Sequence, residues 1–180
     1  MAMSEMSTEA QQILEEIPGS GLKGDYFPRN VLGTLMHNSE TFTPFIRYWV
    51  TSKLKMGLSV REQELVILRM GMLYRSEYVW KHHVPVGREF GITESELDAL
   101  RHAGIPAGFN PRETSLLALT DQLVERRNIN ADDWERWSSS LEKTHILDLI
   151  ALVSQYVLFA LTNNVMQVEL EEPLLGIPGL

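Results

Sequence analysis

The sequence predicts an all-α fold, and three observations support this prediction. Apolar residues recur at intervals of three and four along most of the chain, which is the period of a helix with one buried face. Capping-box patterns, in which a hydroxyl residue is followed three positions later by a carboxylate, run from Ser59 to Glu62 and from Thr93 to Glu96. Clusters of glycine and proline separate the apolar segments and indicate loops.

The N-terminal part of the chain is expected to hold three short helices. Residues 7–16 suit a first helix, and residues 17–27, with one proline and three glycines, suit a loop. A second helix is expected over residues 28–38, because the proline at its start fits the first helical position. For the next helix, Thr43 is the expected cap and Pro44 the expected first residue.

The middle of the chain predicts two helices joined by a short connection. Ser59 is expected to cap a helix over residues 60–74. Ser76 is the expected cap of the following helix, which ends before Gly91. Pro85 lies inside that second helix and is expected to kink it or to begin a new turn.

The C-terminal half begins with further capping signals. Asn110, with a proline directly after it, and Asn130 each suit the start of a helix. The last long helix is expected over residues 143–168. It is apolar on most faces, so we expect it to be buried in the core or against another subunit. Residues 171–180 contain two prolines and two glycines and are expected to be irregular.

Composition limits the class of protein. A chain of 180 residues suits one domain with a substantial core. Its net charge of −8 and pI near 5.1 argue against nucleic acid and anionic membranes as partners. The absence of cysteine excludes disulfides, thiol nucleophiles and thiolate metal sites. We see no signal peptide and no apolar run approaching the roughly 20 residues of a membrane helix, so a cytoplasmic protein is expected.

Glu64 is the first candidate for chemistry. It stands in an apolar helical pattern and shares a helix face with Gly71 and Arg75. The glycine would let another backbone approach this face closely. The carboxylate should then be partly desolvated, and we expect its pKa to be raised toward the range of a general base. The alternative is a structural carboxylate paired with Arg75 or another cation.

His82 and His83 are the next candidates. On a helix they point about 100° apart, so one can face a pocket while the other packs or meets solvent. His82 follows Tyr78 by four residues, so their side chains can touch. Adjacent histidines on one helix are poorly placed to share a metal, and we predict no metal site. The alternative for each is a histidine satisfied within the core.

Three further residues of the same segment complete the candidate site. Tyr78 can donate or accept a hydrogen bond. Trp80 can form an apolar wall, although core packing is the simpler interpretation. Arg75 can hold an anionic substrate, although exposed cations usually belong to a solvated face. No phosphate loop, dinucleotide motif or nucleophile elbow is found in the sequence.

At these residues the sequence resembles the carboxymuconolactone decarboxylase family, which includes the alkylhydroperoxidase D-like proteins. Redox members carry a Cys-x-x-Cys motif, a histidine four residues after it and a glutamate twelve residues before it. The matching positions here are Glu64, Ser76, Val79 and His83, so both cysteines are replaced. The resemblance covers roughly residues 42–170, including the capping pattern that begins at Gly91 and the long apolar final helix.

The resemblance implies an all-helical, alkylhydroperoxidase D-like domain that assembles as trimers or hexamers, with the site near a subunit interface. It does not imply redox activity, because that chemistry requires thiols. The decarboxylase branch of the family removes a carboxyl group from a lactone acid without a metal or organic cofactor. Acid–base residues can suffice for such a reaction.

The leading hypothesis is a cofactor-independent lyase or isomerase that acts on a small carboxylated molecule. Glu64 and His83 would exchange protons with the substrate, and Tyr78 would assist. For this, the first two must lie within hydrogen-bond reach, directly or through one water. The candidate substrate-binding residues are Arg75, His82 and Trp80.

Two other hypotheses remain open from sequence. One is a non-catalytic oligomeric binding protein that kept the scaffold without the redox site. The other is a subunit that acts only with a partner. A polar cavity holding Glu64 and His83 would favour the enzyme. A filled or absent cavity would favour the binding protein. A large exposed apolar patch on the oligomer would favour the partner-dependent subunit.

Overall fold

The computed structural model describes residues 8, 27–102, 104 and 108–180. Within these residues the chain forms eight α-helices and one short 3-10 helix, with no strand, which confirms the all-α prediction. The elements are α2 (Arg29–Met36), α3 (Ser39–Lys55), α4 (Val60–Leu73), α5 (Glu77–Glu89), α6 (Glu94–Leu100), α7 (Pro111–Arg126), α8 (Ala131–Ser140), α9 (Lys143–Val165) and η2 (Glu172–Leu174). The expected helix over residues 7–16 and nearly all of the loop after it lie outside the described residues.

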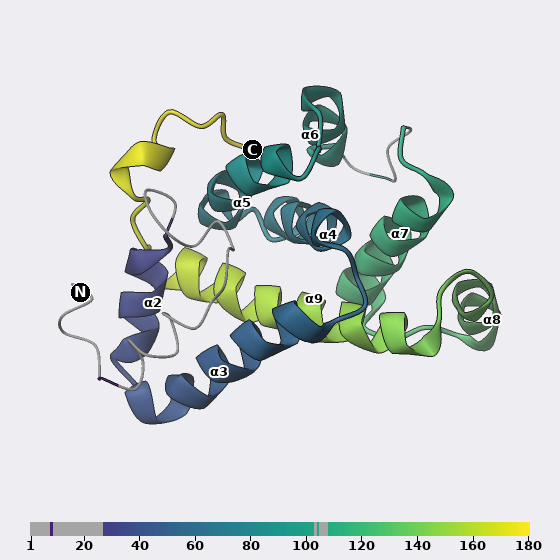
Figure 1. Cartoon of the computed structure of the whole chain (residues 1–180), viewed down its shortest axis with the longest axis horizontal. Coiled ribbons are helices and arrows are strands. Elements are labelled where there is room, and N and C mark those ends of the chain that lie inside the picture. Colours follow the sequence, from purple (N-terminus) through teal and green to yellow (C-terminus); the bar gives the residue numbers. More distant parts are fainter. Residues whose placement is uncertain (1–7, 9–26, 103, 105–107) are drawn as a thin grey trace.

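Helix α9 crosses the middle of the molecule (Figure 1), with α4 and α5 on one side of it and α3 on the other. It contacts α2, α3, α4, α5 and α7. The larger apolar core surrounds its buried face. A smaller apolar cluster lies between α4, α5, α6 and the start of α7. Helix α4 borders both clusters, so most of its side chains are buried.

The predicted helix starts are largely confirmed, because caps depend on residues that are close in sequence. Ser59, Thr93 and Asn110 each form a complete capping box at the start of α4, α6 and α7. Asn130 caps α8 by accepting from the backbone N–H of Asp133. Ser76 stands at the N-cap position of α5, but its side chain makes no capping hydrogen bond.

The prediction that Thr43 caps α3 is wrong. The helix begins at Ser39, and the side chain of Asn38 caps it by accepting from the backbone N–H of Thr41. Pro44 lies inside the helix, where it removes one backbone donor. An asparagine cap is among the strongest. It starts the helix earlier, and the buried Thr43 then lies on the face toward the core.

Helices α4 and α5 form a closely packed hairpin. A Cβ atom at Gly71 would lie 3.2 Å from the backbone nitrogen of Trp80, so the two backbones approach there as the sequence suggested. Helix α5 runs unbroken through Pro85. This hairpin holds the candidate residues of the two helices opposite each other.

Helix α9 is 23 residues long and, by length and composition alone, could cross a membrane. The expectation that no apolar segment approaches the length of a membrane helix is therefore wrong. In the structure one face of α9 is buried against five other helices. The buried face also carries polar side chains, among them Gln155, Tyr156 and Asn163.

Candidate active site

The structure brings Glu64 of α4 and His83 of α5 into direct contact. The His83 Nδ1 atom lies 2.6 Å from the Glu64 Oε2 atom. Nearer the connection, Gly71 packs on Trp80, so the residue pairs follow the order expected of antiparallel neighbours. The geometric requirement for a proton-transfer pair is thus met.

Glu64 is an ionised, buried carboxylate. It is 1% exposed, and burial by itself would raise its pKa. His83 and Lys53 outweigh burial through charge and hydrogen bonding, and they hold the pKa of Glu64 below its usual value. The expectation of a raised pKa is therefore wrong, because the sequence did not show that the fold places Lys53 beside this carboxylate. An ionised Glu64 orients its neighbour rather than acting as the base.

His83 is the group suited to accept a proton. Burial lowers its pKa, and this effect exceeds the opposing influence of Glu64, so the ring is neutral near pH 7. A neutral ring whose Nδ1–H donates to the carboxylate leaves its Nε2 atom as the acceptor. The hydroxyl of Tyr156 lies 3.1 Å from that Nε2 atom and donates to it.

Lys53 and Tyr156 complete the cluster. The Lys53 Nζ atom lies 3.4 Å from the second carboxylate oxygen of Glu64. Burial opposes protonation of this lysine, but Tyr156 and Glu64 raise its pKa above the usual value. Burial raises the pKa of Tyr156 to about 12. The cluster therefore contains an ionised pair, a neutral imidazole and a protonated phenol.

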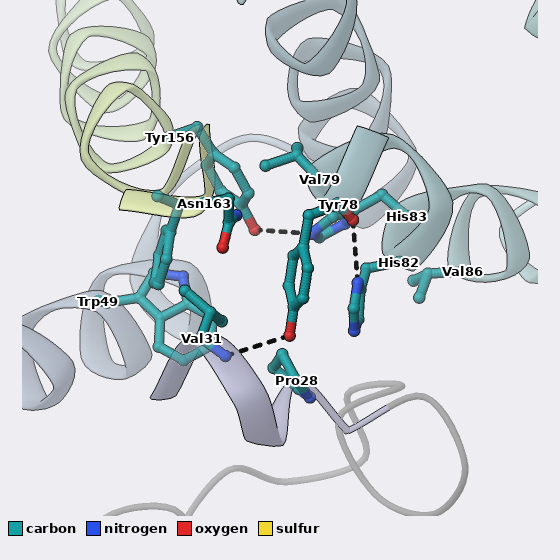
Figure 2. A pocket seen from close by; sticks show the side chains of 11 residues that line it. Pro28, Val31, Trp49, Tyr78, Val79, His82, His83, Val86, Tyr156 and Asn163 are labelled. Carbon is teal, nitrogen blue, oxygen red and sulfur yellow. Dashed lines mark hydrogen bonds between the residues drawn. The ribbon is translucent and has the colours of Figure 1, made fainter. Parts of the chain in front are cut away.

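A cavity of about 40 Å³ borders this cluster (Figure 2). His83 and Tyr156 face it, whereas Glu64 lies behind the imidazole and is not part of the lining. Both adjacent histidines face the cavity. The lining residues are Pro28, Val31, Trp49, Tyr78, Val79, His82, His83, Val86, Tyr156, Phe159 and Asn163.

Tyr78 lines the same cavity, but its hydroxyl faces away from the Glu64 cluster. It donates to the Glu171 Oε1 atom at 2.8 Å and accepts from the backbone N–H of Val31 at 3.2 Å (Figure 2). Burial and the neighbouring carboxylate raise the pKa of Tyr78. The His82 Nε2 atom lies 2.9 Å from the other oxygen of Glu171. Tyr78 therefore does not contact the Glu64–His83 pair that it was predicted to assist. It belongs instead to a second cluster, formed by Tyr78, Glu171 and His82.

Arg75 and Trp80 lie outside the cavity. Arg75 is exposed in the connection between α4 and α5, with a left-handed φ of 51°. Trp80 is fully buried in the smaller apolar cluster, where its indole N–H donates to the carbonyl of Pro178 at 3.1 Å. The structure therefore places these two predicted substrate-binding residues away from the cavity, because Arg75 belongs to the connection before α5 and Trp80 lies on the face of α5 that packs into the smaller apolar cluster.

Among residues 8, 27–102, 104 and 108–180, no group of three or more His, Asp or Glu side chains is arranged to hold a metal ion. The two carboxylate–histidine pairs, Glu64 with His83 and Glu171 with His82, contact tyrosine, lysine and backbone groups instead.

Sequence reasoning missed four polar residues around the cavity, namely Lys53, Tyr156, Asn163 and Glu171. Two of them left a signal. A tyrosine in the middle of an apolar helix, or an asparagine near its end, needs a hydrogen-bond partner when buried, so each indicates a polar site. Lys53 had none, because a lysine in the last turn of a helix is commonplace. Glu171 lies in the segment that was expected to be irregular.

Comparison with known proteins agrees with the resemblance seen in the sequence. Residues 40–122 match the carboxymuconolactone decarboxylase family. An uncharacterized peroxidase-related protein from Ralstonia eutropha JMP134, with the alkylhydroperoxidase AhpD core, superposes with a TM-score of 0.81 at 18% identity, covering 97% of this chain and 91% of that one.

A second solved structure, a protein of unknown function from Agrobacterium tumefaciens, gives a TM-score of 0.68 at 14% identity over 76% of this chain and 94% of that one. No curated protein matches the sequence. The chain therefore has the AhpD core fold, and its sequence contains no cysteine.

Proposed function

We propose that this carboxymuconolactone decarboxylase-like protein is a cofactor-independent acid–base enzyme of the lyase or isomerase type. Its substrate would be a small carbonyl compound, and a lactone acid is the class that the family resemblance suggests. One observation carries the proposal. Hydrogen bonds run from the ionised Glu64 through His83 to Tyr156, and the last two groups face a cavity.

In the proposed reaction, His83 is the base and Tyr156 passes the proton. The phenol oxygen would take a proton from a carbon next to the substrate carbonyl while its own proton moves to the His83 Nε2 atom. Glu64 would stabilise the imidazolium that forms, as a charge held in place before the reaction. For an isomerase, the proton then returns along the same path to another atom of the substrate. For a decarboxylase no C–H proton is removed: loss of carbon dioxide leaves the electron pair of the broken C–C bond on the substrate as an enolate, and a proton taken up from water would be delivered to that carbon through His83 and Tyr156.

The charges around the cavity restrict how a carboxylated substrate could bind. The residues that line the cavity in the described part of the chain include no lysine or arginine. Lys53 lies nearby but is paired with Glu64, and Arg75 is exposed in the turn. We therefore expect the reacting carbonyl to enter the cavity and any carboxylate of the substrate to remain toward solvent.

The test is proton exchange. The purified protein is mixed in D₂O with a panel of small lactones, keto acids and ketones, and NMR follows deuterium uptake next to the carbonyl. We expect His83→Gln and Tyr156→Phe to slow this exchange about 100- to 10,000-fold. His102→Gln, a matched change at an exposed histidine, should leave the rate unchanged. Equal rates in all variants would reject the proposed base.

The non-catalytic binding protein has one observation in its favour, which is the size of the cavity. A volume of about 40 Å³ holds about three water molecules at roughly 10–15 Å³ each. Only a small group can therefore enter without a rearrangement. If the wild-type protein exchanges protons with no member of the panel, this alternative replaces the enzyme.

A further inference from the structure

Asn163 presents a buried amide to the cavity. It lies two turns after Tyr156 on α9, so both side chains point to the same side of the helix, and Figure 2 shows them together at the cavity. Asn163 is 4% exposed. Neither its Oδ1 nor its Nδ2 atom has a hydrogen-bond partner among the described residues.

An unpaired amide is unfavourable in a buried site. Buried polar side chains almost always have partners, and an exception requires an explanation. The other walls around Asn163 are mainly aromatic and aliphatic, including Trp49 and Phe159. A ligand that hydrogen-bonds the amide would remove this deficit, which makes Asn163 a recognition group.

The amide also determines the chemistry of its partner. It presents an acceptor and a donor side by side, so its complement carries a donor and an acceptor side by side. A carboxylate carries two acceptors and would leave the Oδ1 atom facing a negative oxygen. The preference for a donor–acceptor partner holds for either orientation of the amide, because neither the Oδ1 nor the Nδ2 atom is paired among the described residues.

We propose that Asn163 binds a neutral donor–acceptor group of the substrate, with a primary carboxamide as the simplest member and a hydroxy-carbonyl group as another. The proposal rests on the proposed function only in naming this ligand as the substrate. The cavity of about 40 Å³ limits the bound group to a few non-hydrogen atoms. The same group would then lie against Tyr156 and His83.

The test compares acetamide with acetate, which have the same number of non-hydrogen atoms and differ in the donor and the charge. Each is titrated into the ¹⁵N-labelled protein, and NMR follows the side-chain NH₂ signals of Asn163 and the ring signals of His83. We expect acetamide to shift both sets and to bind about tenfold or more tightly than acetate. Equal or tighter binding of acetate, or no shift with acetamide, would overturn the proposal.

Asn163→Leu separates recognition from a structural role. Leucine has a similar volume and no hydrogen-bonding groups, so the variant should lose acetamide binding while its thermal midpoint stays the same or rises. A lowered midpoint, or acetamide binding retained, would contradict the assignment. Asn164→Leu is the comparison, because Asn164 donates to the carbonyl of Tyr74 at 2.8 Å and its loss should lower the midpoint without abolishing binding.

The binding test is independent of turnover. His83→Gln should still bind acetamide, because the proposed contact is made by Asn163. If acetamide binds but no compound exchanges protons, the proposed function fails and the recognition site stands. If proton exchange is observed but acetamide does not bind, the recognition site fails and the proposed function stands.

Discussion

At the scale of single residues, the site depends on how burial and charge divide the roles of Glu64 and His83. The sequence placed the two residues together but predicted a carboxylate base. In the structure, His83 and Lys53 hold the pKa of Glu64 below its usual value, and burial lowers the pKa of His83. Tyr156, which is 73 positions from His83 in sequence, occupies the place that was predicted for Tyr78.

The first prediction concerns Glu64→Gln. The negative charge of Glu64 favours the protonated imidazole, so its removal should lower the pKa of His83 further below the usual value. An NMR titration of the His83 ring signals measures this. Glu89→Gln, at an exposed position of α5, the helix that carries His83, should leave the titration unchanged. A rise in the pKa of His83 would show that Glu64 does not stabilise the protonated imidazole.

The second prediction concerns stability and pH. The pKa of His83 is lower in the folded state than the ordinary value of 6.5, so just below that pH the unfolded chain binds more protons than the folded one. Its contribution to stability is complete above about pH 6.5 and is lost as the pH falls. Urea unfolding at several pH values should show this decline, and His83→Gln should reduce its slope. An unchanged slope would contradict the assignment.

At the scale of elements, the α4–α5 hairpin determines which side chains meet. Local signals predicted both helices and their starts because caps and turns depend on neighbouring residues. The predicted start of α3 was wrong. Asn38 and Thr43 are both acceptable N-caps, and the sequence alone does not show which start buries the better face of the helix.

The third prediction tests the close approach of these helices. Alanine at Gly71 would place a Cβ 3.2 Å from a backbone atom of Trp80, whereas at Gly87 the nearest atoms are the ends of the Ile92 and Leu68 side chains. The backbone of Trp80 cannot easily move away from the added methyl group, and such overpacking lowers the free energy of unfolding by about 1–3 kcal/mol. Both variants gain the same helix propensity of about 1 kcal/mol.

Gly71→Ala should therefore be less stable than Gly87→Ala by roughly 1–2 kcal/mol, as measured by urea unfolding. Equal stability of the two variants would mean that the hairpin can open without cost.

At the scale of the whole molecule, α9 serves as the centre of the core and also exposes apolar side chains. Leu147, Ile150, Leu161 and Val165 lie on its exposed face, and Val165 is 73% exposed. Such a row is typical of a surface that another chain covers. The expected homo-oligomer, a trimer or hexamer by family resemblance, remains a prediction.

The fourth prediction follows from this surface. Light scattering should give a mass that is a multiple of 20.5 kDa. Leu161→Glu should reduce the mass to that of one chain, because it places a charge in the apolar contact. Ser139→Glu, at an exposed position of α8, is the control and should keep the oligomer. A single-chain mass for the wild type would reject the assembly.

The sequence by itself determined the helices, most of their caps and the pairing of Glu64 with His83. These features depend on residues at most 19 positions apart, where helix geometry and a short turn leave few arrangements. Only the tertiary structure decided which groups surround that pair. Lys53, Tyr156 and Asn163 reach the site from α3 and α9, and burial by the whole fold sets the direction of each pKa. Contacts between distant segments and the desolvation they cause arise from packing, which local sequence patterns do not specify.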